Sequence, residues 1–77
     1  MERNVQFGHV NIYHLENKLH DVCTLLQQHD IHILGITETR LSGYKHSTES
    51  ISLPNYTFYR RDAVFPGHTG IGAYIHT

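Results

Sequence analysis

The chain has 77 residues, of which 39% are apolar and 17% are charged, and its formal net charge is −1. A chain of this length forms at most one small domain and buries only about 60% of the surface that it exposes when unfolded. The balanced charge excludes a strongly basic nucleic-acid-binding domain, so contact with phosphate would need a local group of cations. The single cysteine excludes an internal disulfide bond.

The sequence shows no targeting or membrane segment. No apolar run approaches the ~20 residues that a membrane span needs, and residues 1–6 lack the hydrophobic core of a signal peptide. We therefore expect an intracellular protein, in the nucleus or the cytoplasm, without a membrane partner. The spacing of Cys23, His29 and His32 fits no ordinary zinc arrangement, and Cys23 is expected to be a small core residue.

Apolar and polar residues roughly alternate over residues 5–12, which predicts a first strand. Asn11 stands where this strand is expected to end. An asparagine in that place is either a turn or cap residue or a functional group, because a buried amide is costly unless its hydrogen bonds are satisfied. The choice between these interpretations depends on what lies beside it.

An amphipathic helix is predicted next. Its apolar stripe recurs at intervals of four, three and four residues and consists of Leu15, Leu19, Val22 and Leu26. The helix is expected to fade near His29 after roughly fourteen residues, which is close to the typical length. Because an isolated helix of this length is marginal in water, the stripe must pack on a sheet.

Residues 31–37 give the strongest strand signal, a nearly continuous apolar run that is typical of a strand covered on both faces. Within it, Gly35 suggests close approach by a neighbouring element. The run ends abruptly at Glu38, which either marks the exit to solvent or has a function. A strand–helix–strand crossover would bring Asn11 and Glu38 to the carboxyl edge of one sheet, where ligands bind in α/β folds. We therefore predict that Asn11 and Glu38 are the functional residues.

Residues 41–54 are predicted to form a loop, because they are rich in turn-forming residues and show no periodicity. This loop is longer than most connections, and long loops often have a function. Tyr44, Lys45 and His46 within it are candidates for contact with a substrate.

Two further strands, residues 56–61 and 70–76, are predicted to pair as a hairpin. In the first of them, either Phe58 faces the core and its odd-numbered neighbours face out, or the reverse. Arg60 and Arg61 form a local cationic pair. They are either a patch that contacts phosphate or two residues that alternate on a strand at the surface.

Four blocks of the sequence, in order, resemble the endonucleases carried by non-long-terminal-repeat retrotransposons of the jockey type. VNIYHLENKL resembles their N-V-R-S-L-x-N-K-L opening, and DIHILGITETRL resembles the following D-I-x-x-L-x-x-T-E-T-W-L. LPNYTFYRRD resembles the later I-P-G-Y-x-x-x-R-x-D, and GIGAYI resembles the glycine-rich G-G-G-V-A-I-Y-I strand. The quoted blocks run from residue 10 to residue 75, and the resemblance covers nearly the whole chain from Phe7 to Ile75. The wider family is the endonuclease/exonuclease/phosphatase superfamily.

The resemblance implies a fold, a partner and roles. Residues 1–77 would be a partial domain of the α/β class, the amino-terminal strand, helix, strand and hairpin of a four-layer α/β sandwich. Asn11 matches the catalytic asparagine that orients the scissile phosphate, and Glu38 matches the catalytic glutamate that binds a divalent metal, usually Mg²⁺. Arg60 and Arg61 compete for the arginine of the R-x-D block and would bind substrate. The partner would be DNA in a complete domain, and no small-molecule cofactor is implied.

The sequence also departs from the family pattern. His14 stands where the family usually has serine, and Arg40 stands where it has tryptophan, a change expected to weaken local packing. The family's general-base histidine, its partner aspartate and its later G-D-F-N block have no counterpart in these residues, and His76 is no substitute because it falls on the early glycine-rich strand. Two functions therefore stay open. One is a truncated Mg²⁺-dependent DNA endonuclease of a retrotransposon reverse-transcriptase polyprotein, expected to be inactive alone. The other is a non-enzymatic relic or small interaction module without metal or nucleic-acid activity.

Overall fold

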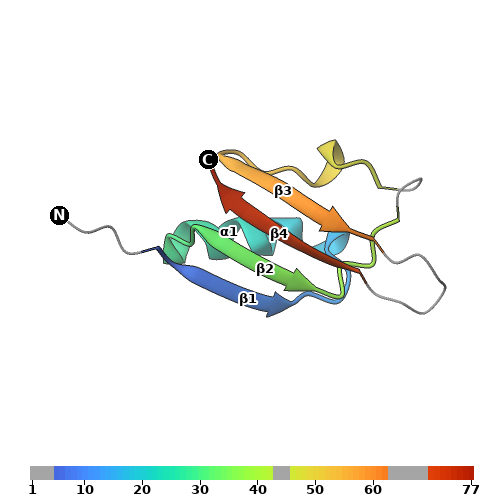
Figure 1. Ribbon diagram of the computed structural model, residues 1–77, viewed down its shortest axis with the longest axis horizontal. Helices are drawn as coiled ribbons and strands as arrows, with labels where there is room; N and C mark the ends of the chain where they lie inside the picture. Colours follow the sequence, from blue (N-terminus) through green and yellow to red (C-terminus); the bar gives the residue numbers. More distant parts are fainter. Residues whose placement is uncertain (1–4, 43–45, 63–69) are drawn as a thin grey trace.

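The computed structural model describes residues 5–42, 46–62 and 70–77. Its elements are, in chain order, β1 (Phe7–Asn11), the 3₁₀ helix η1 (Glu16–Lys18), α1 (Leu19–His29), β2 (Ile33–Thr37), the 3₁₀ helix η2 (Glu49–Ile51), β3 (Tyr56–Arg61) and β4 (Ile71–His76). The four strands form one sheet in the order β1–β2–β4–β3, and α1 lies across one face of it (Figure 1). The two faces of the sheet therefore have different surroundings.

The strand pairing gives three strands the same direction. β1 and β2 are parallel neighbours joined through α1, and β3 and β4 form the predicted antiparallel hairpin. β4 is also antiparallel to β2. Because β4 runs against both of its neighbours, β3 points the same way as β1 and β2. The carboxyl ends of these three strands lie at one edge of the sheet, which we call the carboxyl edge.

The predicted helix forms, although its first turn is the separate 3₁₀ turn η1 and α1 itself has 11 residues. Of the predicted stripe, Leu15, Val22 and Leu26 are buried and Leu19 is partly buried against the core. The helix ends at His29, and its C-cap residue Asp30 has a left-handed backbone (φ 51°) and donates its N–H to the Leu26 carbonyl. No helix in the described part of the chain is long and apolar enough to cross a membrane.

The core lies between α1 and the sheet face that α1 covers. Its buried side chains are Ile12, Leu15, Val22, Leu26, Ile31, Leu34, Ile36, Leu41, Ile51, Phe58 and Tyr74. Leu41 and Ile51 come from the segment predicted to be a loop, where η2 holds Ile51 fully buried. The Tyr74 hydroxyl donates to the Ile51 carbonyl at 2.5 Å and ties β4 to η2. That segment is therefore part of the core.

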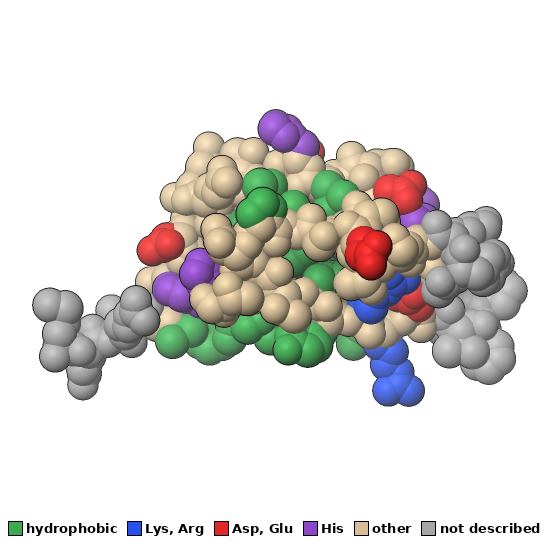
Figure 2. All heavy atoms as spheres, turned by 90° about the horizontal axis from the view of Figure 1, so that it is seen from above, with side chains coloured by type: hydrophobic (Ala, Val, Ile, Leu, Met, Phe, Trp, Pro, Cys, Tyr) green, Lys and Arg blue, Asp and Glu red, His purple; other side chains and the backbone are tan. Residues whose placement is uncertain are grey.

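No described element covers the opposite face of the sheet, which we call the open face. Four large apolar side chains are exposed on it: Phe7, Tyr59, Ile71 and Ile75. Figure 2 shows hydrophobic side chains gathered along one side of the molecule. The prediction that β2 is covered on both faces is wrong for the described residues, since Leu34 and Ile36 are buried but the other three residues of β2 are only partly so. A single helix covers a single face.

The closest approach to a glycine occurs at Gly72 and not at Gly35. A Cβ atom on Gly72 would lie 2.4 Å from Cζ of Phe58, whereas one on Gly35 would meet Cδ2 of His9 at 3.6 Å, an ordinary contact. The prediction for Gly35 is wrong because this residue faces the open side. The buried Phe58 ring lies over Gly72, so Phe58 faces the core and its odd-numbered neighbours face out.

Candidate active site

One row of paired residues crosses the sheet at the carboxyl edge. Asn11 pairs with Thr37, Thr37 with Ile71, and Ile71 with Arg61. Directly paired residues point to the same face, here the open face, and strands about 4.8 Å apart give the row a length of about 14 Å. Glu38 follows Thr37 directly. Asn11 ends β1 and Glu38 directly follows the adjacent strand β2, so both lie at the same edge of the sheet, as the predicted parallel crossover required.

The loops that follow β1 and β2 stay hydrogen-bonded to each other beyond the strands. Three N–H groups donate across at 3.0 Å each: Ile12 to Thr37, His14 to Glu38, and Leu15 to Thr39. These bonds hold the loop after β1 against the loop after β2. The backbone at Asn11 and the backbone at Glu38 are therefore held in fixed positions relative to each other.

Backbone strain is concentrated in these two loops. Four of their residues, none of them glycine, have positive φ angles: Tyr13 (52°), His14 (96°), Glu38 (57°) and Arg40 (54°). A left-handed conformation costs an L-residue roughly 1–2 kcal/mol. Such strain persists only where the surrounding structure imposes it, and it occurs preferentially at functional sites. The strain therefore supports a functional interpretation of the carboxyl edge.

Three polar side chains at this edge have no hydrogen bond or ion pair to another described residue: Asn11, Glu38 and Arg40. Asn11 is exposed, whereas Glu38 is half-buried. A partly buried carboxylate without a partner is costly, so this arrangement is expected where a ligand supplies the partner. An amide, a carboxylate and a guanidinium are available together at one edge.

Arg40 is the residue at this edge whose contact the sequence did not predict. The carbon at the centre of its guanidinium lies 4.3 Å from the centroid of the Tyr13 ring, a cation–π contact. Nζ of Lys18 is 5.9 Å from the same centroid and donates to the Ile12 carbonyl at 2.8 Å. Two cations thus approach one exposed tyrosine. Arg40 therefore contacts an aromatic residue of the neighbouring loop, while the expected loss of packing relative to tryptophan stays a prediction.

One spacing in the sequence is related to this pair. Tyr13 and Arg40 each stand two residues after a predicted functional residue, Asn11 and Glu38 respectively. The spacing alone does not place the two side chains together. Both residues have a left-handed backbone, a conformation that the residue types tyrosine and arginine do not predict.

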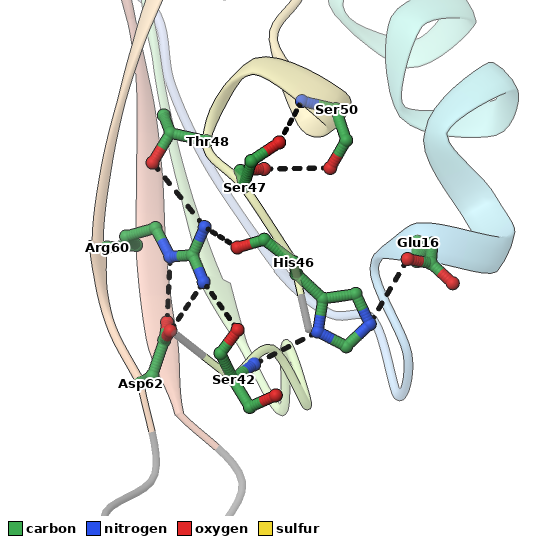
Figure 3. Close-up of polar contacts among 8 residues, drawn as sticks. All are labelled: Glu16, Ser42, His46, Ser47, Thr48, Ser50, Arg60 and Asp62. Carbon is green, nitrogen blue, oxygen red and sulfur yellow. Dashed lines mark hydrogen bonds and ion pairs between the residues drawn. The ribbon is translucent and has the colours of Figure 1, made fainter. Parts of the chain in front are cut away.

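Arg60 and Arg61, predicted together as substrate-binding residues, lie on opposite faces of β3. The Arg60 guanidinium pairs with the Asp62 carboxylate and donates to the carbonyls of His46 at 2.8 Å and Ser42 at 3.3 Å (Figure 3). Its hydrogen bond with Asp62 raises the pKa of Arg60 above the usual value. Arg61 is exposed on the open face and has no partner among the described residues. Substrate binding stays a prediction for both, although the donors of Arg60 already hold a protein segment.

His46 also has a place in this network. Its Nδ1 accepts a hydrogen bond from the Ser42 N–H at 3.0 Å, and its Nε2 lies 3.1 Å from a carboxylate oxygen of Glu16 (Figure 3). Because Nδ1 is an acceptor, the neutral ring carries its proton on Nε2, facing Glu16. Both ring nitrogens are therefore engaged. The other two candidates for substrate contact in this loop, Tyr44 and Lys45, lie outside the described residues.

The donor set at the carboxyl edge suits a hard cation better than zinc. Within the described ranges, no three His, Cys, Asp or Glu side chains come together as a metal cage. Glu38 offers one free carboxylate and Asn11 offers an amide oxygen on the adjacent strand. Mg²⁺ is commonly held by one or two carboxylates, with water and substrate phosphate as its other ligands. The donor types present fit such a partial site, in which Glu38 could be the protein ligand.

The fold has a solved counterpart. The structure of an AP endonuclease from Archaeoglobus fulgidus matches with a TM-score of 0.74 at 18% sequence identity, over 94% of this chain and 27% of that chain. No protein-family model matches the chain, and no curated protein matches it. At this identity the likeness concerns the fold. The chain is an α/β unit that matches part of the α/β sandwich of an AP endonuclease, and it spans about a quarter of that enzyme's length.

Proposed function

We propose that this chain is the amino-terminal portion of a Mg²⁺-dependent endonuclease domain that hydrolyses phosphodiester bonds in DNA. The observation that carries the proposal is the position of Asn11 and Glu38. They stand at the carboxyl ends of adjacent parallel strands, and neither side chain has a described protein partner. This edge is where α/β folds bind their ligands.

In the proposed site the two residues have different tasks. The Glu38 carboxylate would hold Mg²⁺, which supplies positive charge to stabilise the phosphate during attack by water. The Asn11 amide would donate a hydrogen bond to a phosphate oxygen and stay uncharged. The hydrogen bonds between the two loops would keep these groups at a constant separation, and such positioning is a large part of catalysis.

The retrotransposon context is the more specific part of the proposal. It rests on the four ordered sequence blocks that resemble jockey-type endonucleases, which precede a reverse transcriptase in their polyproteins. The likeness to an AP endonuclease is consistent with action on DNA. No general base matches the family pattern in this chain, so we propose that it is inactive alone.

Titration of the ¹⁵N-labelled chain with Mg²⁺, followed by NMR, tests the metal site. We expect saturable shifts at residues 11–14 and 37–40 that disappear in Glu38→Gln. Glu49→Gln is the matched control, since Glu49 is an exposed glutamate at the start of η2 and its loss changes the net charge equally. Shifts that survive Glu38→Gln would contradict the assignment of Glu38.

The same titration separates this proposal from its alternative, a non-enzymatic relic or interaction module. A relic without metal chemistry predicts no saturable Mg²⁺ shift at the carboxyl edge of the wild-type chain. A saturable shift at that edge, lost in Glu38→Gln, contradicts the alternative.

A further inference from the structure

The Tyr13–Arg40 pair has no task in the function proposed above. We propose that Arg40, stacked on Tyr13, binds a phosphodiester group of a nucleic-acid strand beside the Asn11–Glu38 site. This inference rests on the proposed function, because it extends the same site from the reacting phosphate to a second point on the strand. It gives a positioning role to a residue that the sequence comparison marked only as a departure.

The first argument is uncompensated charge. Arg40 has no hydrogen bond or ion pair to a described residue, and its buried Nε has no partner. Lys18, near the same ring, donates to a carbonyl and not to an acid. The acidic side chain closest to Lys18 in sequence, Glu16, lies against His46. The one closest to Arg40, Glu38, forms no ion pair with it in the described part of the chain. The terminal guanidinium nitrogens of Arg40 also have no hydrogen bond to a described residue and, unlike Nε, are not buried. A phosphate oxygen could accept from them, and the planar guanidinium matches phosphate geometry.

The second argument is preorganisation. Arg40 lies between two residues that are almost fully buried, Thr39 at 1% and Leu41 at 2% exposure. Its backbone is held in the left-handed region, and the Tyr13 ring limits the guanidinium to one side. A side chain that is already ordered loses little entropy when it binds. Arg40 is therefore prepared for a ligand in a way that an ordinary surface arginine is not.

The third argument favours a nucleic-acid strand over free phosphate. The Tyr13 side chain remains 54% exposed beside Arg40. Exposed aromatic rings next to cations are the surfaces on which unpaired bases stack while the cation contacts the backbone. A phosphate on Arg40 and a base on Tyr13 are adjacent parts of one nucleotide strand, whereas inorganic phosphate would use Arg40 alone.

The test is binding of a short single-stranded oligothymidylate to the full 77-residue chain in Mg²⁺-free buffer, measured by NMR and fluorescence anisotropy. We expect Arg40→Gln to weaken binding about tenfold, as loss of one charge-assisted contact does. The slope of log affinity against log salt should fall by about 0.7. Tyr13→Leu, which keeps the charge, should weaken binding less and leave the salt slope unchanged. Gln28→Glu, at an exposed position of α1, lowers the net charge by the same amount as Arg40→Gln and should have no such effect.

Three results would overturn the inference. The first is that the wild-type chain does not bind the oligothymidylate. The second is that Arg40→Gln and Gln28→Glu weaken binding equally. The third is that inorganic phosphate shifts the NMR signal of the Arg40 Nε–H group as strongly as the oligonucleotide does at equal concentration. The omission of Mg²⁺ separates this test from that of the proposed function. If oligonucleotide binding depends on Arg40 but Mg²⁺ does not bind at Glu38, the inference is supported and the metal-dependent activity is rejected. If Mg²⁺ binds at Glu38 but oligonucleotide binding does not depend on Arg40, the proposed function is supported and the inference is rejected. The amide spectrum of each variant checks its fold.

Discussion

Arg60 reaches the Asp62 carboxylate with Nε and Nη2, and its Nη1 and Nη2 also donate to the carbonyls of His46 and Ser42, which precede η2. The two side chains are only 13% and 17% exposed. We predict that Arg60→Gln lowers the free energy of unfolding by about 1.5–3 kcal/mol, because it breaks hydrogen bonds that involve charged groups and leaves Asp62 unpaired. Urea unfolding measures the change. A chain of this size has only about 4–12 kcal/mol in total, so the loss is large.

Arg61→Gln is the matched control for this prediction. Arg61 is the next residue along β3, is exposed, and has no partner among the residues that the structure describes. Its substitution should change the stability by no more than about 0.5 kcal/mol. Equal effects of the two substitutions would mean that the Arg60 network contributes nothing to the fold.

Gly72 makes a second prediction about stability. A Cβ atom there would lie 2.4 Å from Cζ and 2.8 Å from Cε1 of Phe58, a buried ring, and 3.1 Å from the Tyr59 carbonyl oxygen. We expect Gly72→Ala to destabilise the chain by about 1–3 kcal/mol through overpacking, measured by urea unfolding. Gly35→Ala, on the adjacent strand, meets only ordinary contacts and serves as the control. Adding Phe58→Leu to Gly72→Ala should recover part of the loss, and failure to do so would contradict the steric explanation.

Local periodicity explains which parts of the fold were predictable. The spacing of Leu15 and Leu26 in one helical stripe and the apolar run of β2 are properties of neighbouring residues. A parallel pair joined through a helix follows from general rules of chain connection. The insertion of β4 between β2 and β3 was not predicted. The pairing of Thr37 with Ile71 joins distant segments, and no local pattern specifies it.

The candidate site was predictable in position and not in detail. Strand ends placed Asn11 and Glu38 at one edge, and the period of two placed Arg60 and Arg61 on opposite faces. Arg60 shares a face of β3 with Phe58, so the arginine on the core side could be identified only once Phe58 was known to be buried. That burial depends on how β3 packs on the core. The contact of Arg40 was missed because it joins two loops 27 residues apart in the sequence, and no local pattern specifies such a contact.

His14 offers a test of backbone strain at the carboxyl edge. It is exposed, and its φ of 96° lies in a region that favours glycine. We predict that His14→Gly raises the free energy of unfolding by about 0.5–1 kcal/mol, because the relief of strain exceeds the entropy cost of glycine. Thermal unfolding should show a melting temperature several degrees higher, since about 1 kcal/mol corresponds to roughly 4–8 °C for a domain of this size.

The control for this prediction is the same substitution in a relaxed helix. His20→Gly, at an exposed position of α1, should lower stability by about 0.5–1 kcal/mol through loss of helix propensity. If His14→Gly raises the free energy of unfolding and His20→Gly lowers it, strain is stored at His14. Destabilisation of similar size at both positions would show that it is not.

The last prediction concerns alkaline pH. Burial raises the pKa of Tyr74, whose side chain is 0% exposed, well above its ordinary value of 10.0, and burial likewise raises that of Tyr56. In the unfolded chain these tyrosines ionise near pH 10, so above that pH the unfolded state binds fewer protons than the folded state. The stability that they contribute is fully present below about pH 10 and falls as the pH rises towards their folded-state pKa values.

Unfolding in urea at a series of pH values above 9 measures this loss. The buried Tyr74 should contribute a slope of up to about 1.4 kcal/mol per pH unit. Tyr74→Phe should remove this contribution, although it also costs the hydrogen bond to the Ile51 carbonyl and lowers stability at neutral pH by about 1 kcal/mol. Tyr59→Phe, at an exposed ring on the open face, should keep the wild-type slope. If Tyr74→Phe and the wild type lose stability with the same slope, the buried hydroxyl does not control the alkaline transition, and the tie between β4 and η2 is weaker than the 2.5 Å contact indicates.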